Sequence, residues 1–145
     1  MENFMKKNEP YCYALLRMVT GFLFLFHGTR WWLGWPGTTT PFEGPWHLIY
    51  IGAPILIFGG IFTCIGMFTR WAAFLSSGLM ACAYWGYYGK KAFALPEGSA
   101  DSAIMMMLPY VNKGELSVMF CFAFLYIAAR GSGVWSMDAK RGKAD

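Results

Sequence analysis

Two long uncharged runs, separated by a single arginine, constrain this sequence more than any other feature. Residues 44–69 contain no Asp, Glu, Lys or Arg over 26 positions, and residues 71–89 contain none over 19 positions. A bilayer hydrocarbon core of roughly 30 Å is crossed by about 20 apolar residues of α-helix. The sequence therefore predicts two transmembrane helices joined by a very short turn at Arg70, which makes them antiparallel neighbours.

Two further apolar segments predict two more spans. Residues 11–32 are long enough to cross the bilayer, although they contain two arginines and a histidine. Residues 115–131 are shorter and are bounded by charged side chains. We therefore expect transmembrane helices near 11–32, 47–68, 71–89 and 115–131. The predicted fold class is all-α: an integral membrane four-helix bundle that forms one domain over residues 1–145.

The composition excludes most other classes of protein. Hydrophobic residues make up 57% of the chain and charged residues 14%, whereas a soluble domain carries roughly 25% charged residues. The aromatic content of 19% excludes a disordered chain. The net charge of +4 sits mostly at the two ends of the chain, so no nucleic-acid partner is expected. The four cysteines are at least 18 residues apart, and this spacing predicts neither a disulfide scaffold nor a metal site.

The distribution of lysine and arginine predicts the orientation in the membrane. With four spans, the side that holds both termini collects eight of these residues, and the opposite side collects four. The positive-inside rule then places both termini in the cytoplasm, and the tryptophans and tyrosines near the predicted outer helix ends agree with this orientation. The first apolar run is too long for a signal peptide and lacks a small-residue cleavage site, so we expect it to remain in the mature protein.

Two connections on the predicted outer side are long. The first, after the first helix, is rich in Gly, Pro and Thr, which is typical of a loop. The second, residues 90–114, includes the apolar run Ala103–Leu108, which is too short to span a bilayer and is expected at the interface or as a lid. Within the bundle, Gly52, Gly59 and Gly66 recur at seven-residue steps, so they are expected to form one packing face of the second helix.

Arg17 and His27 are the notable polar residues of the first predicted helix. Arg17 lies six residues into it, about 9 Å deep, where a charged side chain is costly and is a functional candidate by default. Alternatively, it reaches the cytoplasmic phosphates or pairs near Asp138. His27 lies near the outer end, where an imidazole can donate a hydrogen bond to a quinone carbonyl or accept a proton. The alternative for His27 is a structural, hydrogen-bonded interfacial histidine.

Four residues predict a ligand site at the outer interface. His27 and Arg30 are three residues apart on one helix face, and Trp31 and Trp32 beside them supply an aromatic wall. Glu115 begins the fourth helix at the same expected depth, where a carboxylate also suits the positive end of the helix dipole. We expect His27, Arg30 and Glu115 to come together with Trp31, either as a structural ion pair or around a quinone or lipid headgroup. No residue is predicted to be catalytic, and no metal ligand set is expected.

Four short motifs occur in order along residues 11–138. They are Leu16-Arg17 followed by Phe26-His27-Gly28, Gly59-Gly60 followed by Gly66-Met67-Phe68-Thr69-Arg70, Asn112-Lys113-Gly114-Glu115-Leu116, and Gly131-Ser132-Gly133-Val134-Trp135-Ser136-Met137-Asp138. In this order they resemble the signatures of the DoxX family of bacterial membrane proteins.

The resemblance to DoxX proteins implies a fold and a setting. It implies a multi-pass protein of the bacterial inner (cytoplasmic) membrane with cytoplasmic termini. Family members accompany redox enzymes, so it also implies an accessory subunit of a quinone-linked oxidoreductase or respiratory complex. The implied partners are membrane lipids and other membrane subunits. Such a subunit has no cofactor of its own, and the candidate ligands are a quinone and bound lipids.

Two departures from the pattern of DoxX proteins favour an accessory role. Leu56 stands where members often carry a glutamate, and Trp85 follows Tyr84 where members often carry a histidine. Both missing groups could have served proton or quinone chemistry. The alternative is a purely structural subunit at the edge of a larger respiratory or photosynthetic membrane assembly.

Overall fold

The computed structural model describes residues 1–37, 46, 48–90 and 100–142 of the chain. Every regular element in these residues is helical, which confirms the predicted all-α class for them. The long elements are α1 (Glu2–Leu33), α2 (Ala53–Ile65), α3 (Thr69–Ala83) and α7 (Glu115–Arg130). The short elements are the π-helical turns η1 (Leu48–Gly52) and η2 (Tyr84–Gly89) and the helices α5 (Ala100–Met107), α6 (Pro109–Asn112) and α8 (Met137–Lys140).

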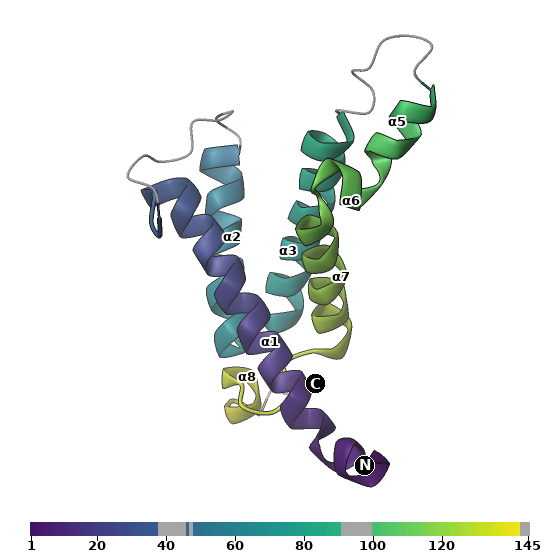
Figure 1. Ribbon diagram of the computed structural model, residues 1–145. Helices are drawn as coiled ribbons and strands as arrows, with labels where there is room; N and C mark the ends of the chain where they lie inside the picture. Colours follow the sequence, from purple (N-terminus) through teal and green to yellow (C-terminus); the bar gives the residue numbers. More distant parts are fainter. Residues whose placement is uncertain (38–45, 47, 91–99, 143–145) are drawn as a thin grey trace.

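The helices form two arms that meet at one end of the molecule and diverge toward the other (Figure 1). In the first arm α1 packs mainly on α2, which continues from η1. In the second arm α3, which continues into η2, packs mainly on α7. The end where the arms meet, termed the closed end, holds α8, the link between α2 and α3 and the beginning of α1. The opposite, open end carries α5 and α6.

The first predicted span corresponds to α1 and the last to α7, and the one large difference is the start of α1. α1 begins at Glu2, well before the predicted boundary of 11–32, and the Lys6 ammonium pairs with Glu2 one turn away at 2.7 Å, which supports this first part of the helix. Pro10 removes one backbone donor within this helix without ending it. α7 matches the predicted 115–131 to within one residue.

The second and third predicted spans each consist of an α-helix with a π-helical turn at one end. The span predicted over 47–68 is observed as η1 followed by α2 and ends at Ile65. It ends there because Gly66 adopts a left-handed conformation (φ 72°), which terminates a helix. The span predicted over 71–89 begins slightly earlier, at Thr69, and is observed as α3 followed by η2.

The short helices α5, α6 and α8 were not predicted by the sequence. α5 covers most of Ala103–Leu108, the run expected at the interface or as a lid, and its Ile104 and Met105 are exposed. α8 begins where the Ser136 hydroxyl accepts a hydrogen bond from the Ala139 amide at 3.1 Å, which caps the helix. Helices this short contain too few turns for a periodic pattern to identify them.

The first arm depends on glycines at the crossing of α1 and α2. A Cβ placed on Gly60 would lie 2.7 Å from the Gly21 carbonyl oxygen and 2.7 Å from the Leu25 amide nitrogen. A Cβ placed on Gly21 would lie 2.6 Å from the Gly60 oxygen and 2.6 Å from the Cys64 nitrogen. Because all of these are backbone atoms, only residues without side chains allow the two helices to approach this closely.

The glycines of the second predicted helix do not form the single packing face expected from their spacing. Gly59 faces α3, where an added Cβ would meet the Ser76 hydroxyl, whereas Gly60 faces α1. Gly52 has only ordinary van der Waals neighbours, and Gly66 terminates α2. A seven-residue step keeps side chains on one face only along a continuous helix, and Gly66 lies beyond its end.

The two arms are joined by an aromatic core. The Phe24 ring of α1 has its centroid 4.5 Å from that of Phe124 and 5.4 Å from that of Phe120, both on α7. All three side chains are buried, together with Leu56 of α2 and Ile127 of α7. Tilted and edge-to-face aromatic pairs add stability beyond the burial of their area. This cluster therefore joins α1 to α7 across the two arms.

One helix, α1, is by itself long and apolar enough to cross a membrane, among the residues that the structure describes. The segment Ile49–Ile65 is also apolar but forms a shorter helix.

We predict that Gly60→Ala destabilises the protein and that Gly78→Ala does not. The new methyl group at Gly60 would press on the backbone of α1, and overpacking of this kind costs about 1–3 kcal/mol. Gly78 of α3 has no atom within 4 Å of an added Cβ, so alanine there leaves the free energy of unfolding unchanged or raises it by up to about 1 kcal/mol. Thermal unfolding of both variants in detergent micelles, followed by circular dichroism, measures this, and equal melting temperatures would contradict it.

Candidate ligand-binding cavity

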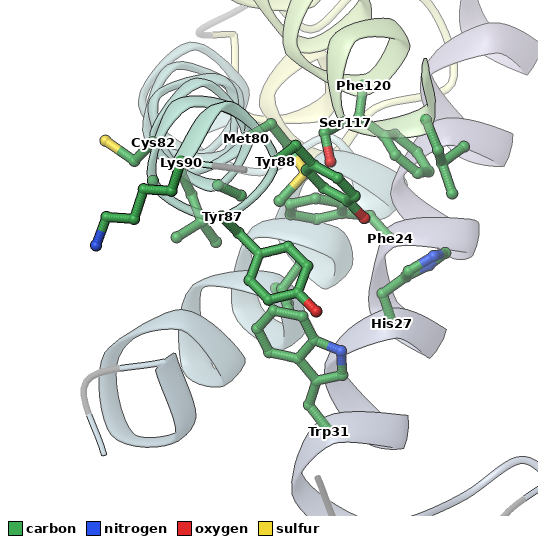
Figure 2. Close-up of a pocket in the computed structure, with 15 residues that line it drawn as sticks. Phe24, His27, Trp31, Met80, Cys82, Tyr87, Tyr88, Lys90, Ser117 and Phe120 are labelled. Carbon is green, nitrogen blue, oxygen red and sulfur yellow. The ribbon is translucent and has the colours of Figure 1, made fainter. Parts of the chain in front are cut away.

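A cavity of about 730 Å³ lies between the two arms (Figure 2). Its size falls within the range of roughly 300–1,000 Å³ that is typical of small-molecule sites. The first arm contributes Phe24, His27, Trp31 and Leu56. The second arm contributes Leu79, Met80, Cys82, Ala83, Gly86, Tyr87, Tyr88, Lys90, Leu116, Ser117 and Phe120. The lining is therefore mainly apolar and aromatic, with few polar groups.

The side chains near the mouth of the cavity differ in their direction. Trp31 and Tyr87 approach each other from opposite arms, and the hydroxyls of Tyr87 and Tyr88 point into the space between the arms (Figure 2). The Lys90 ammonium and the Cys82 thiol point away from this space (Figure 2). Within the described part of the chain, no three His, Cys, Asp or Glu side chains are grouped so that they could hold a metal ion.

His27 is exposed and contacts both arms. Its Nδ1 lies 3.0 Å from the Leu23 carbonyl oxygen, one turn earlier on α1. Its ring meets the Phe120 ring of α7 edge to face, with centroids 5.7 Å apart and planes at 77°. A carbonyl oxygen can only accept a hydrogen bond, so Nδ1 is the donor, and Nε2 is the acceptor nitrogen of the neutral ring.

The structure brings two of the four predicted site residues to the cavity. His27 and Trp31 line it from successive turns of α1. Arg30 and Glu115 are exposed, do not line it, and form no ion pair with each other within the described chain. Successive residues of an α-helix are rotated by about 100°. The side chain of Arg30 therefore points away from that of Trp31, which lines the cavity, although both residues lie within about one turn of His27. The ion pair expected between Arg30 and Glu115 is therefore not formed.

Sequence reasoning missed the contribution of the second arm. Leu79, Ala83 and Tyr87 recur every four residues and all line the cavity, a spacing that indicates one face of a helix. The π-helical turn η2 changes the direction of the side chains that follow it, so the pattern alone does not show which aromatic residues face inward. Tyr84, for example, belongs to a different cluster.

Asn112 anchors the open end of the second arm. Its amide nitrogen donates to the Met106 carbonyl oxygen at 3.1 Å and to the Tyr84 hydroxyl at 3.3 Å. Its amide oxygen accepts from the Gly114 amide at 2.7 Å, and the Tyr84 hydroxyl donates to the Met107 carbonyl oxygen. The side chain of Asn112 is buried, so water does not compete for these bonds. They tie α5 and α6 to η2, which carries two tyrosines of the cavity.

Arg17 joins three parts of the chain at the closed end. Its side chain is fully buried, and its Nη1 donates to the carbonyl oxygens of Thr63 at 3.0 Å and Cys64 at 3.2 Å, in the last turn of α2. Its Nη2 donates to the carbonyl oxygens of Val134 at 3.4 Å and Trp135 at 2.9 Å, in the segment after α7. Carbonyls at a helix end lack partners within the helix. Arg17 of the neighbouring α1 supplies hydrogen-bond donors to these carbonyls, and its side chain does not extend to the surface.

Asp138 and Arg70 complete the closed end. The Asp138 carboxylate accepts from the Thr69 amide and hydroxyl, both at 3.3 Å, and the Asp138 amide donates to the Gly66 carbonyl oxygen at 3.0 Å. The Arg70 guanidinium donates to two carbonyl oxygens in the last turn of α7, at 2.8 and 3.1 Å. An acid at a helix start and a base at a helix end both suit the helix dipole. The Asp138 carboxylate thus bonds to the start of α3 rather than to Arg17.

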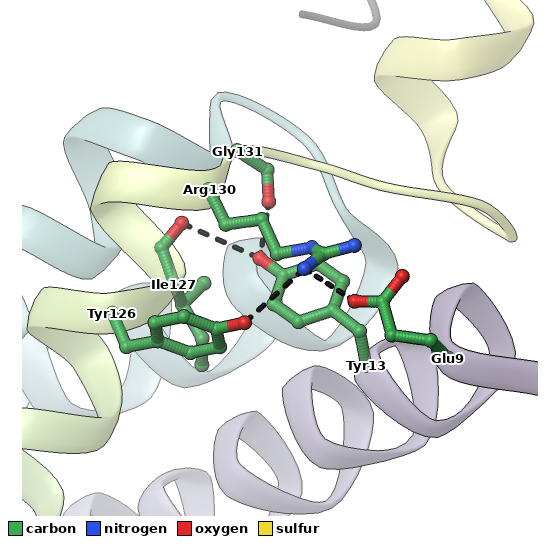
Figure 3. Close-up of polar contacts among 6 residues, drawn as sticks. All are labelled: Glu9, Tyr13, Tyr126, Ile127, Arg130 and Gly131. Carbon is green, nitrogen blue, oxygen red and sulfur yellow. Dashed lines mark hydrogen bonds and ion pairs between the residues drawn. The ribbon is translucent and has the colours of Figure 1, made fainter. Parts of the chain in front are cut away.

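A further cluster at the closed end joins α1 directly to α7 (Figure 3). The hydroxyl of the buried Tyr13 donates to the Gly131 carbonyl oxygen. The Arg130 guanidinium lies over the Tyr13 ring, 4.6 Å from its centroid, which is a cation–π contact. Arg130 also donates to the Tyr126 hydroxyl at 3.2 Å and pairs with Glu9. The closed end is therefore fixed by polar contacts, whereas the cavity between the arms is mainly apolar.

The fold and the cavity define a class of protein in which two helix pairs are tied at one end and enclose an apolar, aromatic site. The chain belongs to the DoxX family, whose model matches residues 12–89. A protein of Haemophilus influenzae with the name "Uncharacterized protein" is 33% identical over 140 residues, which cover 95% of this chain and 96% of the relative. "Putative oxidoreductase CatD" of Bacillus subtilis is 25% identical over 127 residues, which cover 86% of this chain and 82% of that protein. No solved structure gives a significant match.

We predict that Arg17→Ala lowers the free energy of unfolding far more than Arg30→Ala. The first variant leaves buried carbonyls at the end of α2 without donors, which costs about 2–5 kcal/mol. Arg30 lies on the same helix but is exposed, and surface substitutions change stability by about 0.5 kcal/mol or less. Chemical denaturation in detergent measures both values, and a similar loss in the two variants would contradict the structural role of Arg17.

Proposed function

We propose that this protein is an accessory subunit of a quinone-linked redox complex in the bacterial inner membrane and that its cavity binds the quinone ring. The cavity itself is the observation that carries the proposal. A quinone headgroup is a flat apolar ring with two polar oxygens. Aromatic side chains such as Trp31 and Tyr87 suit the ring, and the imidazole of His27 lines the same cavity. The quinone would be a bound ligand, and the subunit would have no cofactor of its own.

A membrane setting with four spans is supported by helix length and by the outward side chains. The first of these segments consists of η1, with five residues, and α2, with thirteen. The second consists of α3, with fifteen residues, and η2, with six. At 1.5 Å per residue these segments measure about 27 and 32 Å, close to the bilayer core of roughly 30 Å. Large apolar side chains are exposed on all four long helices, among them Leu15, Val19, Phe22, Phe58, Phe74, Leu75, Met119 and Phe122. Lipid tails would cover these surfaces.

A redox partner follows from the chemistry of the proposed ligand. Reduction of a quinone adds two electrons and two protons and converts both carbonyls into hydroxyls. We assign the electrons to a partner subunit and the exchange of protons with the ring to His27, which lines the cavity. The name of the Bacillus subtilis relative, "Putative oxidoreductase CatD", supports a redox setting for this chain.

The proposed topology predicts opposite labelling of two positions. In a variant without native cysteines, we expect Gly37→Cys, which lies just after α1 at the open end, to react with a membrane-impermeant maleimide in intact cells. We expect Gly142→Cys, just after α8 at the closed end, to react only after the membrane is permeabilised. Equal labelling of both positions from outside would contradict the orientation that the positive charges predict.

The proposed ligand site predicts different roles for two adjacent tryptophans. Trp31 lines the cavity, whereas Trp32 is exposed and does not. We expect Trp31→Ala to weaken the binding of tetramethyl-para-benzoquinone about two- to tenfold, since ring stacking contributes about 0.5–1.5 kcal/mol. Trp32→Ala, the matched control, should bind like the unaltered protein. Equilibrium dialysis with the protein in lipid nanodiscs measures both affinities.

Two results would overturn the quinone site. One is the absence of saturable binding to the folded protein, and the other is equal weakening by both tryptophan substitutions. If the quinone does not bind but the protein purifies within a larger membrane assembly, the structural role at the edge of such an assembly replaces the proposal.

A further inference from the structure

Exposed aromatic side chains gather near α8 at the closed end of the molecule. Phe68 lies in the link between α2 and α3, and Trp71 lies in the first turn of α3. Trp135 directly precedes the residue that caps α8, and its ring centroid lies 5.2 Å from that of Tyr11 on α1. All four side chains are exposed, Trp71 to 72%. Aromatic side chains at a helix end are typical of the interface between a membrane and water.

Two of these aromatic residues have a backbone conformation that strains a bulky side chain. The angle φ is 49° at Phe68 and 56° at Trp135, so both lie in the left-handed region. Glycine adopts this region without strain, whereas a residue with a Cβ is destabilised there. Both side chains are more than half exposed, so burial within the protein offsets little of this strain. Strained residues of this kind are found where a protein contacts a ligand or partner.

α8 adds two cations to the same surface. The Asp138 amide donates to the Gly66 carbonyl oxygen at 3.0 Å, so α8 lies against the link between α2 and α3. The Arg141 amide donates to the Met137 carbonyl oxygen at 3.1 Å, which continues the helical turn past Lys140. Met137, Lys140 and Arg141 are exposed and are spaced so that they share one face of this turn. That face therefore presents one apolar and two basic side chains.

The acids of the closed end do not neutralise these two cations. Each described acid at this end has a partner of its own: Glu2 pairs with Lys6, Glu9 pairs with Arg130, and the Asp138 carboxylate accepts from Thr69. Within the described part of the chain, Lys140 and Arg141 form no ion pair. Basic side chains beside exposed aromatic rings are suited to the negatively charged surface of a membrane.

We infer that α8 and the adjoining link between α2 and α3 bind the headgroup of an anionic phospholipid. This inference rests on the membrane setting of the proposed function and does not depend on the quinone. The phosphate oxygens of the headgroup accept charge-assisted hydrogen bonds from Lys140 and Arg141. The rings of Phe68 and Trp71 lie at the boundary between headgroups and acyl chains. A free phosphate ion would leave these rings in water, so the aromatic residues favour a lipid over a soluble anion.

Native mass spectrometry of the protein released from lipid nanodiscs tests this inference. The nanodiscs contain phosphatidylglycerol and phosphatidylcholine in equal amounts, and the lipids retained by the protein are counted. A basic residue near an anionic surface strengthens binding about fivefold. We therefore expect about tenfold or greater enrichment of phosphatidylglycerol on the unaltered protein, and we expect the double variant Lys140→Gln, Arg141→Gln to lose most of this enrichment.

The double variant Arg30→Gln, Lys113→Gln is the matched control. It removes the same charge from two exposed residues at the open end, which lie on different elements and do not share one helix face. We expect it to retain phosphatidylglycerol like the unaltered protein. All four residues are exposed, so circular dichroism should show that both variants fold normally.

Four results would contradict parts of this inference in different ways. An equal loss of enrichment in both double variants would show that net charge alone attracts the lipid and would overturn the site. Displacement of phosphatidylglycerol by an equal concentration of inorganic phosphate would overturn the preference for a lipid. Equal retention of both lipids by the unaltered protein would overturn the inference and leave the membrane setting standing. Retention of neither lipid by the folded protein would overturn the membrane setting itself.

Discussion

The hydrogen bonds of Arg17 are the constraint on which the rest of the structure depends. A buried charged group is costly unless polar partners surround it. Here carbonyl oxygens from the end of α2 and from the segment after α7 surround the guanidinium. Because the guanidinium presents several donors in a rigid plane, one side chain fixes α1, α2 and the segment after α7 relative to each other. The position at which the two arms meet follows from this contact.

Once the closed end is fixed, the packing of each arm decides where a cavity forms. Gly21 and Gly60 bring α1 against α2, so the first arm is narrow and has no room for a ligand within it. Phe24 and Phe124 fill the space between the arms. Beyond this aromatic core the arms diverge, and the space between them is lined from both sides. The cavity is thus a consequence of two tightly packed pairs that are tied at one end.

The sequence motifs of the DoxX family mostly mark the scaffold in this structure. Arg17, Arg70 and Asp138 supply donors and acceptors to helix ends at the closed end, and Asn112 performs the same task at the open end. Two motif residues, His27 and Leu116, line the cavity. Most other lining residues lie outside the motifs. The residues that would determine which ligand binds are therefore mostly different from those that hold the scaffold together.

The sequence by itself determined the all-α class and the positions of the long helices, because uncharged length and helix propensity are local properties. It also singled out Arg17 and His27 as polar residues that need an explanation. Only the tertiary structure decided that Arg17 binds carbonyls distant in sequence and that Arg30 and Glu115 form no ion pair. These outcomes depend on the rotation and crossing of the helices, which are set by close backbone contacts such as that at Gly60 and are encoded in no local pattern.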